Sequence, residues 1–486
     1  MCNGVNRAYR IRNQGIIRYN IKPSAACSNQ CCLNLYFSFC AMDASSRLLC
    51  NALMLSWLLV LSSSVVLAEV ATTVLSQDKC TAIVAGRLAS TDGSVFNTYN
   101  ADCAECDWRI NKVPPMDYPE GAERPIYLIT GTYPRAVRSD HGATWTADNL
   151  EPMAQFKEEW MKMRGEIIGW IPQVSHTYGY IEGLYGIMNE WQVAIGESTC
   201  ASKLYAAPIG PTGGGTALLE ASELSQIALE RAKTAKEAIH VMGSLAEKYG
   251  FYSADWTIDK YGPAHAMGEG GEALTVSDTT EAWVFHIIPD DTKSSAVWIA
   301  QRVPDGHVAV LANQFIIKEV IPGHPDFMYS ANLYDVAKRM GWWDDSKGRL
   351  NFLETFAPPR YHPNYSNMRV WRIFSLVNPS AKWPALTDKW ASDYPFSVPV
   401  EADKKLSLLD MLNFNRDHYQ GSRFDMEKGL AAGPYGDPNR YDIWSWDNMV
   451  RNPHTFLTSA YPTFIDSLRC PRGRIPSGNR PLQNQL

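Results

Sequence analysis

From Cys80 onward, apolar residues come in short alternating runs separated by turn residues, a pattern typical of β-strands. Cys80–Ala85 and Ser94–Tyr99 predict the two strands of a hairpin. Residues 90–93 between them read Ser-Thr-Asp-Gly, and the glycine supplies the positive φ angle that a turn of this kind needs. The first ordered element is therefore predicted to be a strand that starts at Cys80.

Residues typical of strands also occur at Arg124–Thr132, Gly186–Ser198, Ala273–Ile288 and Ala296–Phe315. A predicted turn at Asn189-Glu190 interrupts the stretch Gly186–Ser198. Helical spacing appears instead in Ala217–Tyr249, before Gly250, and again in Leu406–Asp417. Strands, then helices, then strands predict sheets covered by helices, which is an α+β class of fold.

The residues before Cys80 are predicted to include a targeting segment. Leu48–Ala68 is apolar, follows Arg47 and ends in small residues, so it is predicted to be a signal peptide that begins at Met42. Residues 1–41 are then an upstream extension outside the mature protein. The alternative is a membrane anchor, since residues 48–68 are long enough to span a bilayer if they are not cleaved. Both interpretations place the protein in the secretory pathway, and residues 69–79 form a short polar propeptide.

Composition adds few constraints. The chain has 486 residues, of which 45% are hydrophobic and 20% charged, and its net charge is −6. These values predict a soluble globular body with no electrostatic reason to bind nucleic acid. No His-Glu-x-x-His or Gly-x-Ser-x-Gly motif occurs, which disfavours a metallopeptidase or a serine hydrolase.

Cys80 is the candidate that carries chemistry. If cleavage between Lys79 and Cys80 makes it the first residue, it combines a thiol nucleophile with an α-amino group whose pKa is ~8, suited to moving protons at neutral pH. The thiol itself could attack the Lys79 carbonyl, or a protease could cut after lysine. On the residues alone, the alternative is a half-cystine or a buried thiol without a catalytic role.

Several blocks from Cys80 onward, in the same order, resemble the cysteine dipeptidases of the N-terminal-nucleophile superfamily, the PepD-type enzymes to which the secernins are related. The blocks are residues 80–102, Tyr185–Thr199, Leu229–Ala238, Glu281–Phe285, Trp298–Phe315, Arg369–Ser380 and Arg416–Arg440. The resemblance implies one domain over residues 80–440 with a four-layer αββα sandwich. It also implies a short peptide substrate with an unblocked amino end and no metal or organic cofactor.

The resemblance further assigns roles to single residues. Cys80 matches the nucleophile, and Asp102 matches the acidic residue beside the nucleophile's amino group, where it would orient the amine. Asn313 matches the asparagine whose amide donates to the tetrahedral oxyanion, although an asparagine at a strand end is also a common turn former.

Three further candidates complete the set. Asn189 and Thr199 are possible oxyanion or substrate-binding residues, or they shape the hairpin. Arg369 could pair with a substrate carboxylate or form a structural salt bridge.

The chain departs from the family at two places. Tyr99 stands where the family has an arginine, and residues 441–486 do not resemble the family's continuation, so this tail is predicted to be divergent and partly disordered. Two alternatives stay open. An amidase that acts on non-peptide amides is one, because the superfamily also handles other acyl groups, and the departures favour the other, a non-catalytic, secernin-like protein in secretion. Assembly into a homo-oligomer is possible.

Overall fold

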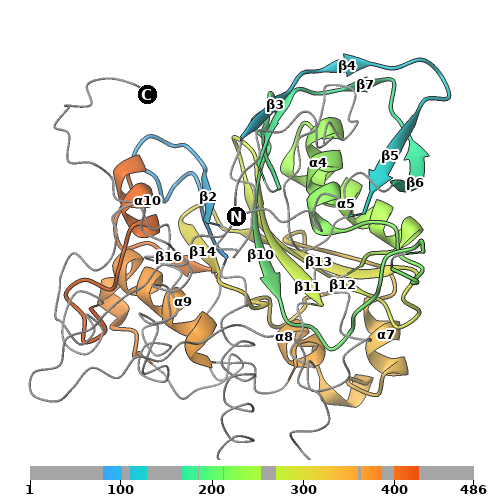
Figure 1. Cartoon of the computed structure of the whole chain (residues 1–486). Coiled ribbons are helices and arrows are strands. Elements are labelled where there is room, and N and C mark those ends of the chain that lie inside the picture. Colours follow the sequence, from blue (N-terminus) through green and yellow to red (C-terminus); the bar gives the residue numbers. More distant parts are fainter. Residues whose placement is uncertain are drawn as a thin grey trace, which may run out of the picture. The chain divides into compact units, whose positions relative to one another are not determined.

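The computed structural model (Figure 1) describes the part of the chain that holds most of the predicted strands and helices. All described residues belong to the unit Ser76–Leu486. The leader, the propeptide and the tail lie outside them, so these boundaries and the domain 80–440 stay predictions. The described residues are 80–100, 110–128, 167–183, 185–211, 213–252, 270–358, 363–385 and 399–425.

A four-stranded antiparallel sheet holds the start of the described chain. Its order is β16-β14-β1-β2, with β1 (Thr81–Ala85) between β14 (His307–Leu311) and β2 (Phe96–Asn100) and with β16 (Val400–Glu401) at one edge. All five residues of β1 are buried. Since β1 is held on both sides, the position of the residue before it, Cys80, is fixed by the sheet.

A second antiparallel sheet has eight strands. β10 pairs with β11 along its whole length, but among the described residues it pairs with β9 only at Ala194, opposite Met188. In sheet order the strands are β15 (Phe327–Tyr329), β13 (Ala296–Val303), β12 (Ala282–Pro289), β11 (Gly271–Ser277), β10 (Ala194–Cys200), β9 (Gly186–Asn189), β8 (Tyr180–Glu182) and β3 (Asn111–Val113). Two short ribbons accompany it: β4 (Met116–Asp117) with β7 (His176–Thr177), and β5 (Glu123–Tyr127) with β6 (Ile167–Pro172).

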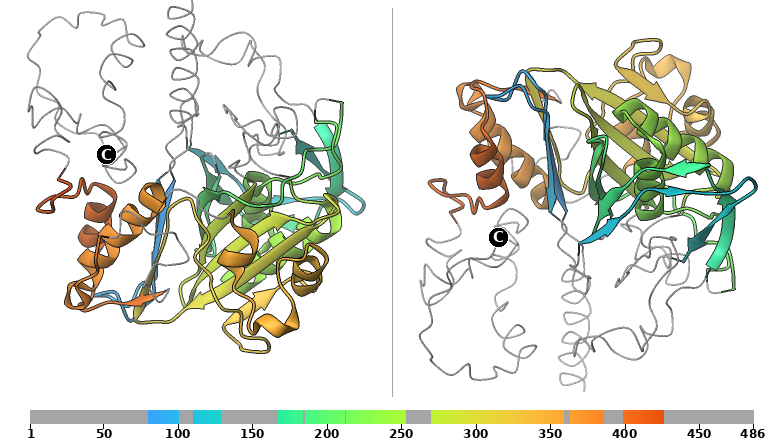
Figure 2. Two further views of the ribbon diagram at one scale, coloured as in Figure 1. Left: turned by 90° about the horizontal axis from the view of Figure 1, so that it is seen from below. Right: turned by 90° about the horizontal axis from the view of Figure 1, so that it is seen from above.

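The two large sheets pack face to face, with β1 and β2 against β10 and β11 (Figure 2). Gly196 permits the close approach, because a Cβ atom there would lie 2.6 Å from Thr275 Oγ1 and 3.1 Å from the Cβ of Tyr99. Asn97 on β2 then ties the sheets together, since its Nδ2 donates to the carbonyl of Ala194 and to Ser277 Oγ, both at 3.1 Å.

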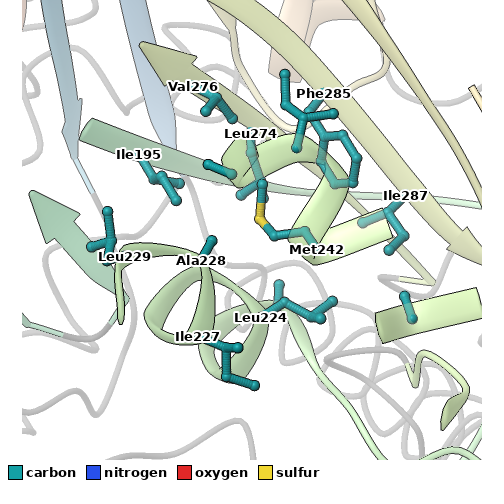
Figure 3. Packing of buried hydrophobic residues seen from close by; sticks show 14 of the residues in the cluster. Ile195, Leu224, Ile227, Ala228, Leu229, Met242, Leu274, Val276, Phe285 and Ile287 are labelled. Carbon is teal, nitrogen blue, oxygen red and sulfur yellow. The ribbon is translucent and has the colours of Figure 1, made fainter. Parts of the chain in front are cut away.

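Helices α4 (Ala221–Arg231) and α5 (Ala235–Tyr249) cover the eight-stranded sheet, and apolar side chains from both helices and from the sheet strands form the core between them (Figure 3). Thr234 caps α5, and Gly250 ends it with a φ of 79°. At Gly243 the helix touches the sheet: a Cβ atom there would lie 2.4 Å from the Trp298 ring on β13.

The four-stranded sheet is covered by α9 (Pro363–Val377) and α10 (Leu408–Asn415), whose buried residues pack on Ile83 and Val310 (Figure 1). A capping box formed by Ser407 and Asp410 starts α10. Shorter helices complete the described chain, with α7 and α8 contributing to the core between the sheets. These are α7 (Leu333–Arg339), η3 (Asp345–Lys347), α8 (Phe352–Phe356) and η4 (Pro379–Ala381).

The α+β prediction is confirmed. The predicted hairpin is present as β1 and β2, with Gly93 at a φ of 83° in the connection. The helical stretch 217–249 proves to be two helices, and Gly250 ends the second as expected. Helix α9 was not predicted, and it brings Arg369 beneath β1.

A buried ion cluster fastens the β5–β6 ribbon to α4. Arg124 on β5 donates from Nη1 to Glu223 Oε2 at 2.6 Å and from Nη2 to Glu230 Oε1 at 2.9 Å. The three side chains are at most 1% exposed. The two carboxylates keep the pKa of Arg124 well above its ordinary value although burial alone would lower it. Removing the arginine would leave two buried carboxylates without their cation.

Arg124→Met is therefore expected to lower the free energy of unfolding by about 3–5 kcal/mol, the usual cost of breaking a buried ion pair. Arg349→Met is the control, because the pair Arg349–Glu319 is exposed and should contribute less than about 1 kcal/mol. Urea unfolding of both variants measures the difference. Equal losses in the two variants would contradict the structural role given to the buried cluster.

Candidate active site

Cys80 lies directly before β1 and is only 4% exposed. Its carbonyl oxygen accepts hydrogen bonds from Arg369 Nη1 at 2.5 Å and from Ser198 Oγ at 3.4 Å. Its thiol is hydrogen-bonded to the Glu197 carboxylate. Cys80 and Cys200 are the cysteines of the described part of the chain, and neither forms a disulfide. The backbone of Cys80 is thus fixed from one side while its sulfur faces an acidic side chain.

Arg369 joins three segments that are far apart in the sequence. Besides the Cys80 carbonyl, Nη1 reaches Thr81 Oγ1 at 3.1 Å, and Nη2 donates to the Ala312 carbonyl at 3.0 Å and to Asn313 Oδ1 at 2.9 Å. The side chain is fully buried. These partners are backbone, hydroxyl and amide oxygens of described residues, and the guanidinium is closed off from solvent. They indicate that Arg369 positions Cys80 relative to Asn313.

Asn313 follows β14 in the left-handed region, with a φ of 57°, a conformation that asparagine tolerates better than most residues. Its backbone N–H donates to Ser198 Oγ at 2.7 Å, and its Nδ2 donates to the Thr199 carbonyl at 2.8 Å. With Oδ1 bound to Arg369, the amide is held in one orientation. One Nδ2 proton is used by Thr199, so the second is the one that could serve an oxyanion.

Strand β10 supplies the other wall of the site. Ser198 links the two key residues, since its hydroxyl donates to the Cys80 carbonyl and accepts from the Asn313 N–H. Thr199 Oγ1 donates to Glu197 Oε1 at 2.7 Å. Thr199 therefore contacts both Asn313 and Glu197, and its hydroxyl is engaged with a carboxylate.

Glu197 was missed from the sequence. Burial raises its pKa, because loss of water disfavours the charged carboxylate; hydrogen bonds from the Glu272 carboxyl, the Thr199 hydroxyl and the Cys80 thiol act in the opposite direction. The structure shows why it matters: Glu197 is an acidic residue in the middle of a strand whose seven residues are all buried. Such a position is rarely occupied by a carboxylate unless it is structural or functional.

Tyr99 on β2 stands where the resemblance expects an arginine. Burial raises the pKa of its hydroxyl, and the negative charges of Glu197 and Cys80 raise it further. The hydroxyl therefore stays neutral near the thiol. The site has a hydrogen-bonding phenol at this position in place of a cation.

Asn189 has a structural role. Its Nδ2 donates to the carbonyls of Leu229 and Ala232, and its Oδ1 accepts from the N–H groups of Trp191 and Val193. Both donors and the acceptor are occupied by the β9–β10 turn and the end of α4. Of the two interpretations, the hairpin-shaping one fits these contacts.

The remaining candidates, Lys79 and Asp102, lie outside the described residues. Within the described ranges, no group of three or more His, Cys, Asp or Glu side chains has the arrangement of a metal site. No helix of the described chain is both long enough and apolar enough to cross a membrane.

The segment after Asn313 is supported by a buried histidine. His286 Nε2 on β12 accepts from the N–H groups of Ile316 at 3.0 Å and Ile317 at 3.2 Å. An acceptor must be unprotonated, and burial lowers the pKa of His286 from 6.5 to about 3. This neutral ring therefore helps to hold the Asn313 backbone in place.

Residues 176–448, more than half of the chain, match the sequence profile of Peptidase family C69. The chain therefore belongs to this family, which confirms the resemblance. The matched region includes Thr199, Asn313 and Arg369, but it begins after Cys80.

Three curated relatives are similar to the chain. A "Probable dipeptidase" of Salmonella dublin is 23% identical over 241 residues, which are 49% of this chain and 48% of that protein. A "Probable dipeptidase" of Latilactobacillus sakei is 26% identical over 43% of this chain and 38% of that protein. A "Dipeptidase" of Bifidobacterium longum is 24% identical over 74% of this chain and 60% of that protein. The chain thus spans about half the length of the curated relatives it matches.

The lowered pKa of His286 predicts acid sensitivity. Below pH 6.5 the unfolded chain gains a proton that the folded chain does not accept until about pH 3. The contribution of the neutral His286 ring to the free energy of unfolding is complete above pH 6.5. Below that value it falls by about 1.4 kcal/mol per pH unit. His286→Gln keeps an acceptor but removes the titration.

Between pH 6.5 and 4.5, wild type is expected to lose about 2–3 kcal/mol more unfolding free energy than His286→Gln. His324→Gln, at an exposed histidine, is the control and should follow wild type. Urea unfolding at the two pH values provides the test. A variant as acid-sensitive as wild type would show that His286 is not the buried neutral group described.

Proposed function

We propose that this chain is a cysteine-type dipeptidase that hydrolyses short peptides through an acyl-enzyme on Cys80. The observation that carries the proposal is the buried Arg369 guanidinium, which binds both the Cys80 carbonyl and the Asn313 amide oxygen. It holds Cys80 and Asn313, which are far apart in the sequence, in one site, in a member of Peptidase family C69. The names of the curated relatives support the same activity.

The packing of the described sheets and helices supports the finer fold assignment. Two antiparallel sheets in contact, one covered by α4 and α5 and the other by α9 and α10, fit the four-layer αββα sandwich of N-terminal-nucleophile hydrolases. In this arrangement Cys80 stands at the beginning of a central strand. A free amino terminus there would lie next to the thiol.

The chemistry starts with removal of everything before Cys80, by attack of the thiol on the Lys79 carbonyl or by another protease. The exposed α-amine then accepts the thiol proton as Sγ bonds to the scissile carbonyl carbon. The second Nδ2 proton of Asn313 donates to the resulting oxyanion. The C–N bond breaks as the ammonium returns its proton to the leaving amine, and water then cleaves the thioester and restores the thiol.

Arg369 and Asp102 are assigned supporting roles. Arg369 holds the Cys80 backbone so that the thiol and the new amine point into the site, and it fixes the rotamer of Asn313. Asp102 would orient the α-amine and stabilise its protonated form, as the family resemblance implies. Entry into the secretory pathway through residues 42–68, with 69–79 as propeptide, is part of the same proposal.

The mature protein is expected to begin at Cys80 and to hydrolyse an unblocked dipeptide. Cys80→Ala should lower turnover by about 10³-fold or more, the scale seen when a nucleophile is removed. Cys200→Ala is the matched control, because it removes the other buried thiol of the described chain. Amino-terminal sequencing and a dipeptide assay measure both effects.

A mature chain that starts before Cys80, with the cysteine still internal, would contradict the mechanism. Equal turnover of amino-blocked and unblocked substrates would contradict a dipeptidase and favour the amidase alternative. No hydrolysis by a chain that begins at Cys80 would favour the secernin-like alternative.

Asn313→Gly tests the oxyanion donor. Glycine accepts the positive φ of 57°, so the substitution removes the amide without the backbone strain that alanine would introduce. Turnover number is expected to fall about 10²- to 10³-fold. Lys382→Gly is the control, since Lys382, the exposed residue that follows η4, also has a positive φ. Steady-state kinetics would exclude the assignment if Asn313→Gly retained the wild-type turnover number.

A further inference from the structure

The Glu197 carboxylate lies beside the proposed nucleophile. Glu197 and Thr199 are two residues apart on β10 and so share a face of the sheet. Thr199 pairs with Glu272 on β11, which makes the two glutamates diagonal neighbours on that face. Both are fully buried. Two carboxyl groups therefore lie next to each other, and one of them touches the Cys80 thiol.

Glu197 has no cation among its partners in the described chain. Oε1 accepts from Thr199, and Oε2 receives no hydrogen bond from an N–H or hydroxyl group of a described residue. The other contacts are a thiol and a second carboxyl group. On α4, by contrast, Arg124 neutralises the buried carboxylates of Glu223 and Glu230. A buried carboxylate is costly without such a cation, and burial accordingly raises the pKa of Glu197. A positively charged group brought by a ligand would stabilise the ionised carboxylate here.

The position also fits the geometry of a peptide. The α-nitrogen of a substrate is about 2.5 Å from its first carbonyl carbon, as standard bond lengths require. A sulfur about to attack that carbon lies about 3–3.5 Å from it. A carboxylate in contact with the sulfur is therefore within reach of an α-ammonium group. If the attacked peptide bond were far from the amino end of the substrate, the Glu197 carboxylate could not reach the α-ammonium group.

We propose that Glu197, supported by Glu272 and oriented by the Thr199 hydroxyl, binds the α-ammonium group of the substrate and so selects peptides with an unblocked amino end. This inference rests on the proposed function, since it places the substrate at Cys80. It assigns Glu197 as a specificity residue, and Thr199 as the residue that positions it. The ligand class is a peptide or aminoacyl amide whose terminal amine is protonated.

The test measures protection of Cys80 from alkylation by iodoacetamide, which needs no turnover. The probes are alanyl-alanine and its N-acetyl derivative, with initial rates taken before the dipeptide is hydrolysed. In wild type, alanyl-alanine should protect at a concentration about 10- to 100-fold lower than the acetylated peptide, the range of a charge-assisted hydrogen bond. Glu197→Gln should lose this preference. Glu319→Gln, at an exposed glutamate, is the control and should keep it.

Two further readouts make the result decisive. Thr199→Val keeps the carboxylate but removes its hydrogen-bond donor, so an intermediate loss of preference is expected even if Glu197→Gln folds poorly. Amino-terminal sequencing reports maturation separately: protection without cleavage at Cys80 would keep the binding assignment while the proposed function fails. A wild type that does not distinguish the two peptides, or a folded Glu197→Gln that still does, would overturn the inference.

Discussion

The buried guanidinium of Arg369 is the interaction on which the site depends. It reaches the residue before the central strand β1 and the residue that follows β14, and it comes from α9 on the outer face of their sheet. Strand pairing alone aligns β1 with β14 but does not set the direction of the Cys80 carbonyl or the Asn313 amide. Arg369 sets both, because its planar fork presents donors in fixed directions. Ser198 makes a second link between the same two residues from the opposing sheet.

The electrostatic character of the site follows from what surrounds this anchor. The cation is directed at carbonyl and amide oxygens, while the thiol side is formed by Glu197, Glu272 and the neutral hydroxyl of Tyr99. The arginine that the family resemblance predicts at position 99 would have balanced these acidic groups, whereas Tyr99 is neutral. These buried carboxyl groups would favour a positively charged substrate group and disfavour an anionic one. The same feature links the proposed activity to a preference for unblocked amino ends.

Local patterns predicted much of the fold. Alternation located β1 and β2, and Gly93 and Gly250 marked a connection and a helix end because both positions have positive φ. Long-range contacts were less accessible. Arg369 was recognised as a candidate, but its partners are more than 50 residues away in the sequence, so its positioning role could not be read from its neighbours. Asn189 looked similar to a site residue and proved to hold the turn. Glu197 was not predicted as a site residue, because only the burial of β10 in the structure marks its carboxylate as unusual.

The central claim is that Arg369 aligns Cys80 with Asn313. Its most direct test is the turnover of an unblocked dipeptide by Arg369→Lys, compared with Arg372→Lys one turn along α9, where the arginine binds Asp417 instead. Lysine keeps the charge but cannot reach both residues with a planar fork. A loss of about 10²-fold or more in Arg369→Lys, with Arg372→Lys close to wild type, is the predicted result. Wild-type turnover in Arg369→Lys would contradict the account.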